Sequence, residues 1–475
     1  MTTSRHLAAA ALGVSLLAVP AAAQPLLTEA MRADMERLVG AATTSSRAAE
    51  ILRSLTDSVG ARLAGSPGDR AAVAWGLATL RALGFSNVRA EKVMVPVWRR
   101  ISEEAEMTAP YRHPLAATAL GGSVSTPSGG IAAEVIEADS LAAVDALGAR
   151  ASGKIVFIYK KTERQQDGRG YGETVPIRGA GAIHAAKLGA VAVLIRSVGT
   201  DDNRLPHTGA MSYDDAVPKI PAAALSTPDA DLLHRVLADG RPVMVTLKLR
   251  TETGPDAESA NVVGEIPGRE KPGEIVLVGG HLDSWDLGTG AIDDGAGCAI
   301  SIEAARLIGV LPRRPRRTVR VVLFANEENG LRGGRAYVAD HAAELAKHAA
   351  AIEADAGGDR AYGFSWNAGP AAEPFFKEAA AFLAGIGAGD FRKGGAGGAD
   401  ISPLLASGVP LLGLRNDSSR YFDYHHTAND TFDKVDPAQL NQATAAMAAM
   451  LYALAETAEP LPRIPEADRA GRRPE

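Results

Sequence analysis

Cysteine is almost absent from this sequence of 475 residues, in which Cys298 is the single cysteine. One cysteine cannot form an internal disulfide, so a fold held together by disulfide bridges is excluded. Cys298 begins the apolar-periodic stretch "CAISIEAARLI", which predicts a buried structural thiol and not a catalytic one. Stability must therefore come from a hydrophobic core, for which the 46% apolar composition is sufficient, and from any metal that the chain binds.

Long apolar runs are missing after the first residues, since no later segment has the ~18 uninterrupted apolar residues that a membrane-spanning helix needs. The N-terminus, "MTTSRHLAAAALGVSLLAVPAAAQ", combines a short basic region, an apolar stretch and small residues before Gln24. This pattern predicts a signal peptide over residues 1–23, cut after Ala23, and hence an exported protein, periplasmic or secreted. The alternative is a membrane anchor, but the apolar stretch is short and Pro20 interrupts it. We therefore expect no membrane anchor in the mature form.

An excess of one sign of charge is also lacking, because 50 basic and 56 acidic residues leave a formal net charge of -6. Acids and bases are mixed along the chain, which gives no basic surface of the kind that binds nucleic acid. The stretch "GARASGK" at 148–154 has the spacing of a phosphate-binding loop. However, Ile155 follows where serine or threonine is needed, and the glycines precede a strand. We therefore predict neither nucleic-acid nor nucleotide binding.

Changes in sequence pattern divide the rest of the chain into four segments. Residues 24–109 contain predicted helices and a strand, while residues 110–256 contain short apolar strands, polar loops and no cluster of acids and histidines. From 257 to 461, apolar strands alternate with helices. This alternation predicts an α/β fold with a mixed, mostly parallel sheet covered by helices on both faces. We interpret residues 110–256 as a domain inserted into this fold and residues 462–475 as a disordered tail.

Acidic and histidine side chains follow the strands of the α/β part, where the functional sites of such sheets lie. They are His281 and Asp283 after the first strand, Glu327 and Glu328 after the second, and Asp355 after the third. Two further groups are the aspartates of "AIDDGAG" and the histidines of "YFDYHHTANDT". Clustered carboxylates repel each other, so a bound cation is needed to offset the cost. Asp, Glu and His without Cys suit zinc in a hydrolytic site.

Four of these motifs, "GHLDSWDLGTGAIDDGAG", "NEENG", "EADAGG" and "HHTANDT", resemble those of the M28 family of co-catalytic zinc peptidases. The resemblance extends over nearly the whole mature chain, including "RLAGSPG" and "PHTG…VPKIP", and gives residues 110–256 the place of that family's protease-associated domain. It implies two zinc ions per chain, a peptide substrate and a possible homodimer. The zinc ligands that it implies are His281 and Asp355 for the first ion, Glu328 and His426 for the second, and Asp293 as the bridge between them.

The resemblance makes Glu327 the general base, while the residues themselves suggest a role for Asp283. Asp283 lies two residues after His281, on the same face of an extended chain. Its carboxylate can therefore accept a hydrogen bond from the imidazole nitrogen that does not bind metal. The alternative for Asp283 is a carboxylate that caps the turn. Glu327 and Glu328 are adjacent and point to opposite sides of an extended backbone, so one can bind metal while the other faces the attacking water.

The resemblance implies an exopeptidase that hydrolyses dipeptides or short peptides with a free N-terminus, in which Glu327 moves a proton from water to the leaving amine. Two alternatives are a single-zinc glutaminyl cyclase of related fold and a non-catalytic, receptor-like relative without metals; the complete ligand set disfavours both. In one respect the chain departs from some family members, which place a tyrosine near the site as an oxyanion donor. The matching residues 394–399 are only glycine and alanine, and His425 or a backbone N–H could take that role. Asp294 is expected to support the turn beside the bridging aspartate.

Overall fold

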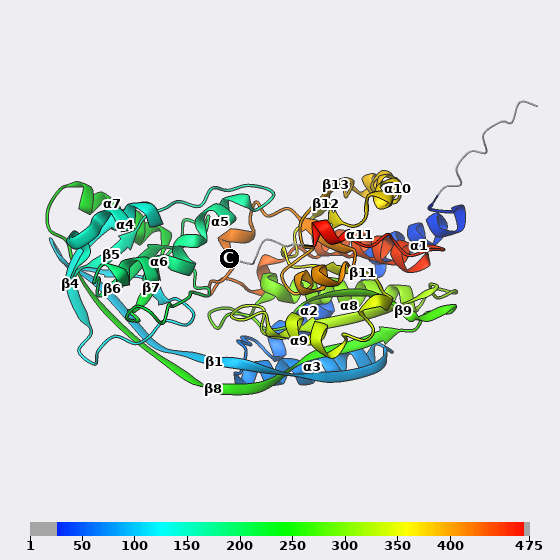
Figure 1. The fold of residues 1–475 in the computed structure, drawn as a ribbon, viewed down its shortest axis with the longest axis horizontal. Coiled ribbons are helices and arrows are strands. Elements are labelled where there is room, and N and C mark those ends of the chain that lie inside the picture. The colour runs from blue at the N-terminus through cyan, green and yellow to red at the C-terminus, as the bar shows by residue number, and fades with distance from the viewer. Residues whose placement is uncertain (1–25, 470–475) are drawn as a thin grey trace, which may run out of the picture.

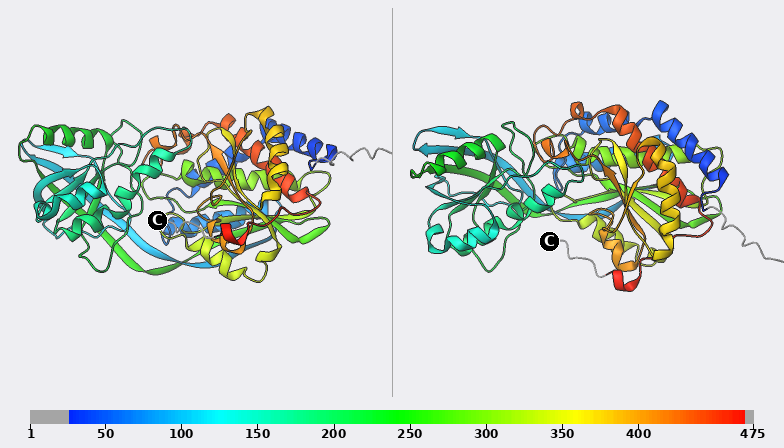
Figure 2. Two further views of the ribbon diagram at one scale, coloured as in Figure 1. Left: turned by 45° about the horizontal axis from the view of Figure 1, so that its top comes forward. Right: turned by 90° about the horizontal axis from the view of Figure 1, so that it is seen from above.

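The computed structural model describes residues 26–469, which form two parts joined by a long ribbon (Figure 1). The larger part, which we call the core domain, contains the N-terminal helices and the C-terminal half of the chain. The smaller part, which we call the insert, contains residues 110–243 between the two strands of the ribbon. Figure 2 shows the same separation from two other directions.

The sheet of the core domain is built from apolar strands joined by helices. Its strands lie in the order β13, β12, β14, β11, β9, β10, β8 and β1. The central strands β14, β11, β9 and β10 are parallel, whereas β8, β1 and β12 each run antiparallel to a neighbour. The predicted α/β fold with a mixed, mostly parallel sheet is therefore confirmed. The bounds are β1 Ser86–Ala109, β8 Met244–Ile266, β9 Lys271–His281, β10 Arg317–Phe324, β11 His348–Glu353, β12 Ala361–Asn367, β13 Asp390–Lys393 and β14 Leu411–Asn416.

Helices cover both faces of this sheet. The first face carries α1 Glu29–Ser45, α2 Ala48–Ser58, α3 Pro67–Ala82, α8 Ala296–Gly309, α10 Glu373–Leu383 and α11 Pro437–Glu456, and the second carries α9 Arg332–Asp340 with short 3-10 helices. The sequence marks where several of them begin. Before α3 the Ser66 side chain accepts a hydrogen bond from an N–H of the first turn, and before α11 Asp436 does the same. Proline follows each cap.

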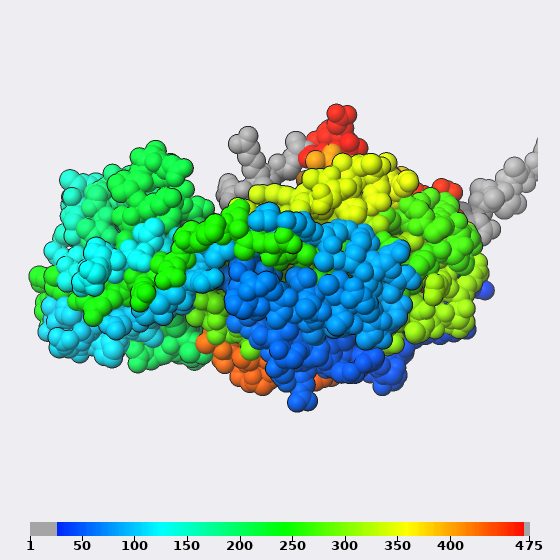
Figure 3. All heavy atoms as spheres, turned by 90° about the horizontal axis from the view of Figure 1, so that it is seen from below, coloured from blue at the N-terminus to red at the C-terminus, as the bar shows by residue number. Residues whose placement is uncertain are grey.

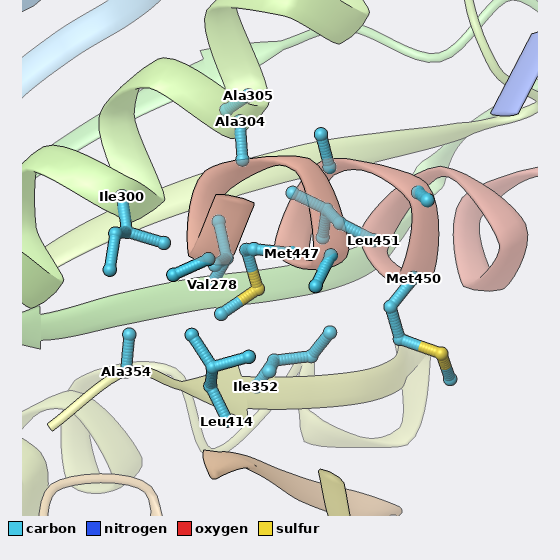
Figure 4. Packing of buried hydrophobic residues seen from close by; sticks show 14 of the residues in the cluster. Val278, Ile300, Ala304, Ala305, Ile352, Ala354, Leu414, Met447, Met450 and Leu451 are labelled. Carbon is cyan, nitrogen blue, oxygen red and sulfur yellow. The ribbon is translucent and has the colours of Figure 1, made fainter. Parts of the chain in front are cut away.

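Alternate residues of each central strand pack on opposite faces of the sheet. In β9, Val276 and Val278 pack under the helices of the first face, and Leu277 packs on the second face. Figure 4 shows Val278 close to Met447 and Leu451 of α11. Burial on both faces explains why these strands are continuous apolar runs, and it gives the loops that follow them a rigid base.

The strands β1 and β8 form an antiparallel ribbon that runs from the core domain into the insert (Figures 1 and 3). Near one end Arg89 lies opposite Val263, where β8 also pairs with β10; at the other end Ala109 lies opposite Met244, where β8 also pairs with β4. Register shifts interrupt the ladder between these ends, and such irregularities bend a ribbon. The predicted boundary at residue 256 therefore falls inside β8, a strand that both parts share.

The insert has a sheet and hydrophobic clusters of its own. Its parallel strands are β4 Ile131–Ala138, β5 Ile155–Ile158, β6 Ala192–Arg196 and β7 Ala222–Leu225, with β3 Ala117–Ala119 antiparallel to β7 and β2 His113–Leu115 beside β1. Its helices are α4 Leu141–Leu147, α5 Arg169–Thr174, α6 Pro176–Lys187 and α7 Thr227–Ala238. Neighbouring residues of β5, Val156 and Phe157, pack in different clusters on the two faces of this sheet. The assignment of the insert to the protease-associated class stays a prediction.

Both ends of the chain lie outside the described residues 26–469. The predicted signal peptide lies outside the described residues. Within residues 26–469, no helix is both long and apolar enough to cross a membrane. The predicted disordered tail needs correction for residues 462–469, because Ile464 is fully buried and its N–H donates to the Gly408 carbonyl at 2.9 Å. Burial of Ile464 and hydrogen bonds from the Arg463 guanidinium to the Ser407 and Leu345 backbone oxygens hold this segment on the core domain.

Candidate metal centre

Three parallel strands of the core domain end side by side, and predicted site residues follow their carboxyl ends. The last residues of β9 and β10, His281 and Phe324, lie opposite each other in the ladder, and β11 ends beside β9. The segments after β10 and β11 therefore bring Glu327, Glu328 and Asp355 to the edge of the sheet where β9 ends.

The first group of candidate ligands is His281, Asp293 and Asp355. The Nε2 atom of His281 lies 3.1 Å from Asp293 Oδ1 and 3.7 Å from Asp355 Oδ1. One ligand atom from each residue lies within 4.8 Å of the other two, so a single cation can contact all three. The structure thus brings together the three residues predicted for the first zinc.

The second group lies on the other side of Asp293. The Nε2 atom of His426 lies 3.0 Å from Asp293 Oδ2 and 3.0 Å from Glu328 Oε2. The other ring nitrogen of His426, Nδ1, lies 3.2 Å from the backbone oxygen of Thr208, which belongs to the insert. The two oxygens of Asp293 therefore face two different histidines, which is the position expected of a bridging carboxylate.

His425 also reaches the second group. Its Nε2 atom lies 3.4 Å from Asp293 Oδ2, and its ring stacks on that of His426 with the centroids 3.5 Å apart. Asp293, His425 and His426 form another set whose ligand atoms all lie within 4.8 Å of one another. Glu328 and His425 are thus both close enough to join His426, and the choice of Glu328 and His426 as ligands stays a prediction.

Burial and mutual charge decide the protonation of the cluster. Burial alone would raise the pKa of the Asp293 carboxyl, but the rings of His425, His281 and His426 hold it well below its usual value. Burial opposes the charged form of His281, yet Asp293 and Asp355 raise its pKa well above the usual value. By contrast, burial lowers the pKa of His426 and holds that of His425 well below its usual value, so of the three rings only His281 is favoured in its charged form.

The role of Asp283 differs from the prediction in one respect. The ring nitrogen Nδ1 of His281 donates to the backbone oxygen of Asp283 at 3.0 Å, whereas the Asp283 carboxylate is 3.8 Å away. The carboxylate oxygen Oδ1 instead accepts the N–H of Glu327 at 2.9 Å. Asp283 therefore orients His281 through its carbonyl group and holds the start of the glutamate pair through its side chain. Burial raises the pKa of this carboxyl to about 6.

The neighbouring glutamates have different surroundings. Glu328 is buried, with Oε1 accepting the N–H of Trp285 at 3.2 Å and Oε2 facing His426. Glu327 is half-buried and lines the cavity above the cluster. Burial raises the pKa of both carboxyls well above the usual value. Their surroundings thus fit the predicted division into a ligand and a base, which stays a prediction.

A cavity of about 280 Å³ lies above the cluster, between the core domain and the insert. Its lining comprises Asp293, Glu327, Glu328, Asp355, Tyr421, Phe422, His425 and His426 of the core domain, and Tyr171 and Arg178 of the insert. The Tyr171 ring stacks on Phe422 with centroids 4.5 Å apart, and the Arg178 guanidinium lies over Tyr171 at 5.4 Å. The insert therefore forms one wall of the candidate active site.

Comparison with known proteins identifies the family. The family model described as peptidase family M28 matches residues 261–451. Carboxypeptidase Q of Mus musculus is 40% identical over 399 residues, which cover 84% of this chain and 83% of that protein. Human carboxypeptidase Q is 39% identical with the same shares covered. The chain belongs to peptidase family M28.

Solved structures agree with this membership. The crystal structure of an M28 peptidase precursor from Shewanella amazonensis SB2B is 45% identical, with a TM-score of 0.91 over 92% of this chain and 99% of that one. The zinc aminopeptidase BSAP of Bacillus subtilis shares the fold, with a TM-score of 0.63 at 22% identity over 87% of this chain and 95% of that one. The predicted enzyme class, an M28 metallopeptidase, is confirmed.

Asp294 holds the backbone of this M28 site. Its oxygens accept the N–H groups of His281 and Gly297, each at 3.0 Å, which is the supporting role expected for it. Glycine is needed at 297 because a Cβ there would lie 1.9 Å from the Ala354 backbone oxygen. The start of α8, which contains Gly297, thus packs tightly against the residue that follows β11.

Two further supporting residues of the M28 site were missed by the sequence analysis. Asp430 accepts the N–H groups of Ile292 at 2.6 Å and Asp293 at 3.2 Å, so it fixes the backbone of the candidate bridge. The buried guanidinium of Arg62 donates to three backbone oxygens of the loop 282–290. Both lie in motifs that carry the family resemblance. Their partners are backbone groups, which every residue has, so the sequence does not indicate which residues they contact.

The wall formed by the insert was also missed. Arg178 lies on the buried face of α6, on the same side as Ala182 and Ala185. An arginine at helical spacing from small apolar residues on the buried face is unusual, because a charge there needs a partner. That signal could have marked Arg178 as a candidate functional residue.

Proposed function

We propose that this M28 chain is an exported exopeptidase that binds two zinc ions and hydrolyses dipeptides or other short peptides with a free N-terminus. The observation that carries the proposal is the position of Asp293, whose carboxylate lies 3.1 Å from His281 Nε2 and 3.0 Å from His426 Nε2. A carboxylate shared between two histidine-containing groups suits a pair of metal ions.

The donor atoms of the two groups fit zinc. They are imidazole nitrogens and carboxylate oxygens, and in the described residues the single cysteine is buried with its thiol donating to the His281 carbonyl. His281 and Asp355 would hold one ion, Glu328 and His426 the other, and Asp293 both. Zinc bound there would lower the pKa of water and stabilise the negative charge that develops on the substrate carbonyl.

Glu327 would move the proton. Its backbone N–H is fixed by Asp283, while its carboxylate is left at the cavity. In this position it can take a proton from the attacking water and deliver it to the leaving amine. Burial favours the protonated form of Glu327, which makes the carboxylate a stronger base once it is ionised.

The insert favours a short substrate. The Arg178 Nε–H donates to the Ala210 backbone oxygen at 3.3 Å, and Arg178 Nη1 lies 3.5 Å from His426 Nδ1. If His426 Nε2 faces metal, Nδ1 carries the hydrogen, so Arg178 keeps its terminal donors for a ligand. A residue spans at most about 3.5 Å, so the carboxylate of a dipeptide could reach this guanidinium from a scissile bond at the cluster.

A single-zinc glutaminyl cyclase is the alternative that the fold allows. It would need one of the two ligand groups, whereas both are assembled around Asp293. The proposal of export rests on the signal-like sequence of residues 1–23. Assembly as a homodimer stays a prediction.

Metal content and substrate range test the proposed function together. Purified protein should contain about two zinc ions per chain, as expected of a two-metal site. A chelator should abolish hydrolysis of a dipeptide library, and added zinc should restore it. Peptides with a blocked N-terminus should be poor substrates, and glutaminyl peptides should be hydrolysed without cyclisation. Full activity in a metal-free sample, or cyclisation as the main reaction, would contradict the proposal.

A further inference from the structure

Two residues of the insert run alongside the two neighbouring histidines of the core domain. The His207 Nδ1–H donates to the His425 backbone oxygen at 2.7 Å. The Thr208 N–H donates to the His426 backbone oxygen at 3.0 Å, and the Thr208 oxygen accepts the Nδ1–H of His426 at 3.2 Å. Three hydrogen bonds thus join the dipeptide 207–208 to the dipeptide 425–426, although one lies in the insert and the other in the core domain.

The His207 ring is itself held tightly in place. Its side chain is 1% exposed, and its Nε2 atom lies 3.2 Å from Asp201 Oδ1. Its backbone N–H donates to the Ser197 hydroxyl at 2.9 Å. The ring packs against Gly199 so closely that a Cβ there would lie 2.2 Å from Nε2. The Thr227 hydroxyl lies 3.0 Å from the Asp201 backbone oxygen and 3.3 Å from Asp201 Oδ1, so it contacts both the backbone and the carboxylate of this residue.

His426 needs such a neighbour because of its backbone. Its φ angle is 62°, in the left-handed region that is unfavourable for a residue with a side chain. This conformation persists only when surrounding contacts impose it. The contacts of His207 and Thr208 fall on the peptide groups on either side of this residue.

We propose that His207, oriented by Asp201, is a positioning residue that sets the peptide between His425 and His426 and so aims His426 Nε2 at Asp293 and Glu328. The insert thereby completes the second group of metal ligands while contributing no ligand atom to it. This inference rests on the proposed two-zinc function. A histidine that only joined the two parts of the protein would stabilise the fold without discriminating between the two metal groups.

Stepwise zinc titration of the metal-free full chain, against a competing chelator, tests the inference. Partners of metal ligands typically change metal affinity by about 10- to 100-fold. His207→Ala should therefore weaken one of the two zinc sites by about that factor and leave the other unchanged. His184→Ala is the matched control, because His184 pairs with Asp145 within the insert and should leave both affinities unaltered.

Two conservative variants separate positioning from packing. His207→Asn keeps an N–H donor at the place of Nδ1, so it should restore most of the lost affinity. His207→Gln offers its donor at the place of Nε2, toward Asp201, and should not. Circular dichroism and the Tm identify the variants that fold. If His207→Ala does not fold, the comparison of His207→Asn with His207→Gln tests the inference instead.

The outcomes distinguish this inference from the proposed function. Wild-type protein that binds fewer than two zinc ions contradicts the proposed function and this inference with it. Wild-type protein that binds two zinc ions while His207→Ala keeps both affinities contradicts the inference alone. The inference also fails if both sites weaken equally, or if His207→Gln restores the affinity as well as His207→Asn does.

Discussion

The core domain and the insert place different kinds of groups at the cavity between them. The core domain contributes the candidate metal ligands and Glu327, from loops that follow buried parallel strands. The insert contributes an aromatic ring and a guanidinium, Tyr171 and Arg178, and it reaches the cavity on a two-stranded ribbon. Metal ligation needs atoms fixed within a few tenths of an ångström, which strand ends provide. The insert is tied to this framework by the hydrogen bonds between residues 207–208 and 425–426 and by the stacking of Tyr171 on Phe422.

The two parts also differ in charge at the cavity. The core domain presents carboxylates and histidines, whereas the insert presents the Arg178 guanidinium. A peptide with free ends carries both charges, so it can place its amino group toward the carboxylates and its carboxylate toward Arg178. Under the proposed function, the core domain would carry out the chemistry and the insert would select short substrates. Three predictions test this division.

The largest effect is expected for the glutamate pair of the core domain. Glu327→Gln keeps the shape of the side chain and removes the base, so kcat should fall by about 10²–10⁴-fold while both zinc ions are retained. Glu328→Gln, at the adjacent residue, should instead lose zinc from one site. Metal stoichiometry and kcat of the two variants provide the measurement. Near-normal activity of Glu327→Gln would remove the general base from the mechanism, and the opposite pattern of zinc loss would exchange the two roles.

An intermediate effect is expected for the cation of the insert. Arg178→Met keeps most of the side-chain length and removes the charge. Hydrogen bonds to charged groups contribute about 1.5–3 kcal/mol, so kcat/KM for dipeptides with a free C-terminus should fall about 10- to 100-fold. Dipeptides with an amidated C-terminus should be hydrolysed by both proteins at similar rates. Arg169→Met, on the exposed surface of α5, is the control. An equal loss on free and amidated dipeptides would mean that Arg178 does not select for a carboxylate.

The smallest effect is expected where the two parts pack together. Gly121 of the insert lies against the Trp285 ring of the core domain, and a Cβ there would come within 1.9 Å of it. Gly121→Ala should therefore destabilise the protein by about 1–3 kcal/mol, the usual cost of overpacking. Gly129→Ala, in the same part of the chain, has no atom within 4 Å of its added Cβ and should change stability little. Thermal unfolding of both variants measures the difference; equal Tm values would show that the two parts are not tightly packed at this contact.

Much of the core domain could be predicted from the sequence, because its signals are local. A run such as "EIVLVGG" followed by histidine and acids predicts both a strand and the position of the site residues at its end. The role of Asp283 was less predictable, since either its carbonyl or its carboxylate could accept from His281, and the fold of the turn decides. The ribbon was harder still, because one strand serves two parts of the molecule. Gly254, Pro255 and Asp256 are residues typical of a turn, yet they lie inside β8 beside a register shift.

The contributions of the insert to the site could not be predicted in the same way. Arg178 and His426 lie 248 residues apart in sequence, and His207 and His425 lie 218 apart. No periodicity links such pairs, and a histidine in a loop has the same local pattern whether it orients a metal site or faces solvent. The motif that contains His207 indicated family membership, but the hydrogen bonds of its ring become visible only in the folded chain.

The ribbon also has a consequence for the order in which the chain assembles. Strands β1 and β8 are neighbours in the sheet, yet the whole insert separates them in sequence, so pairing them closes a very long loop. The chain loses conformational entropy when this loop closes, and it does so before the hydrogen bonds of the ladder can compensate for the loss. If the insert folds first around its hydrophobic clusters, it brings Ala109 opposite Met244. The pairing of β1 with β8 can then extend from this end of the ribbon toward the core domain. This order suits a chain that emerges from its N-terminus, in synthesis or in export, because the insert emerges before the strands that precede the candidate metal ligands.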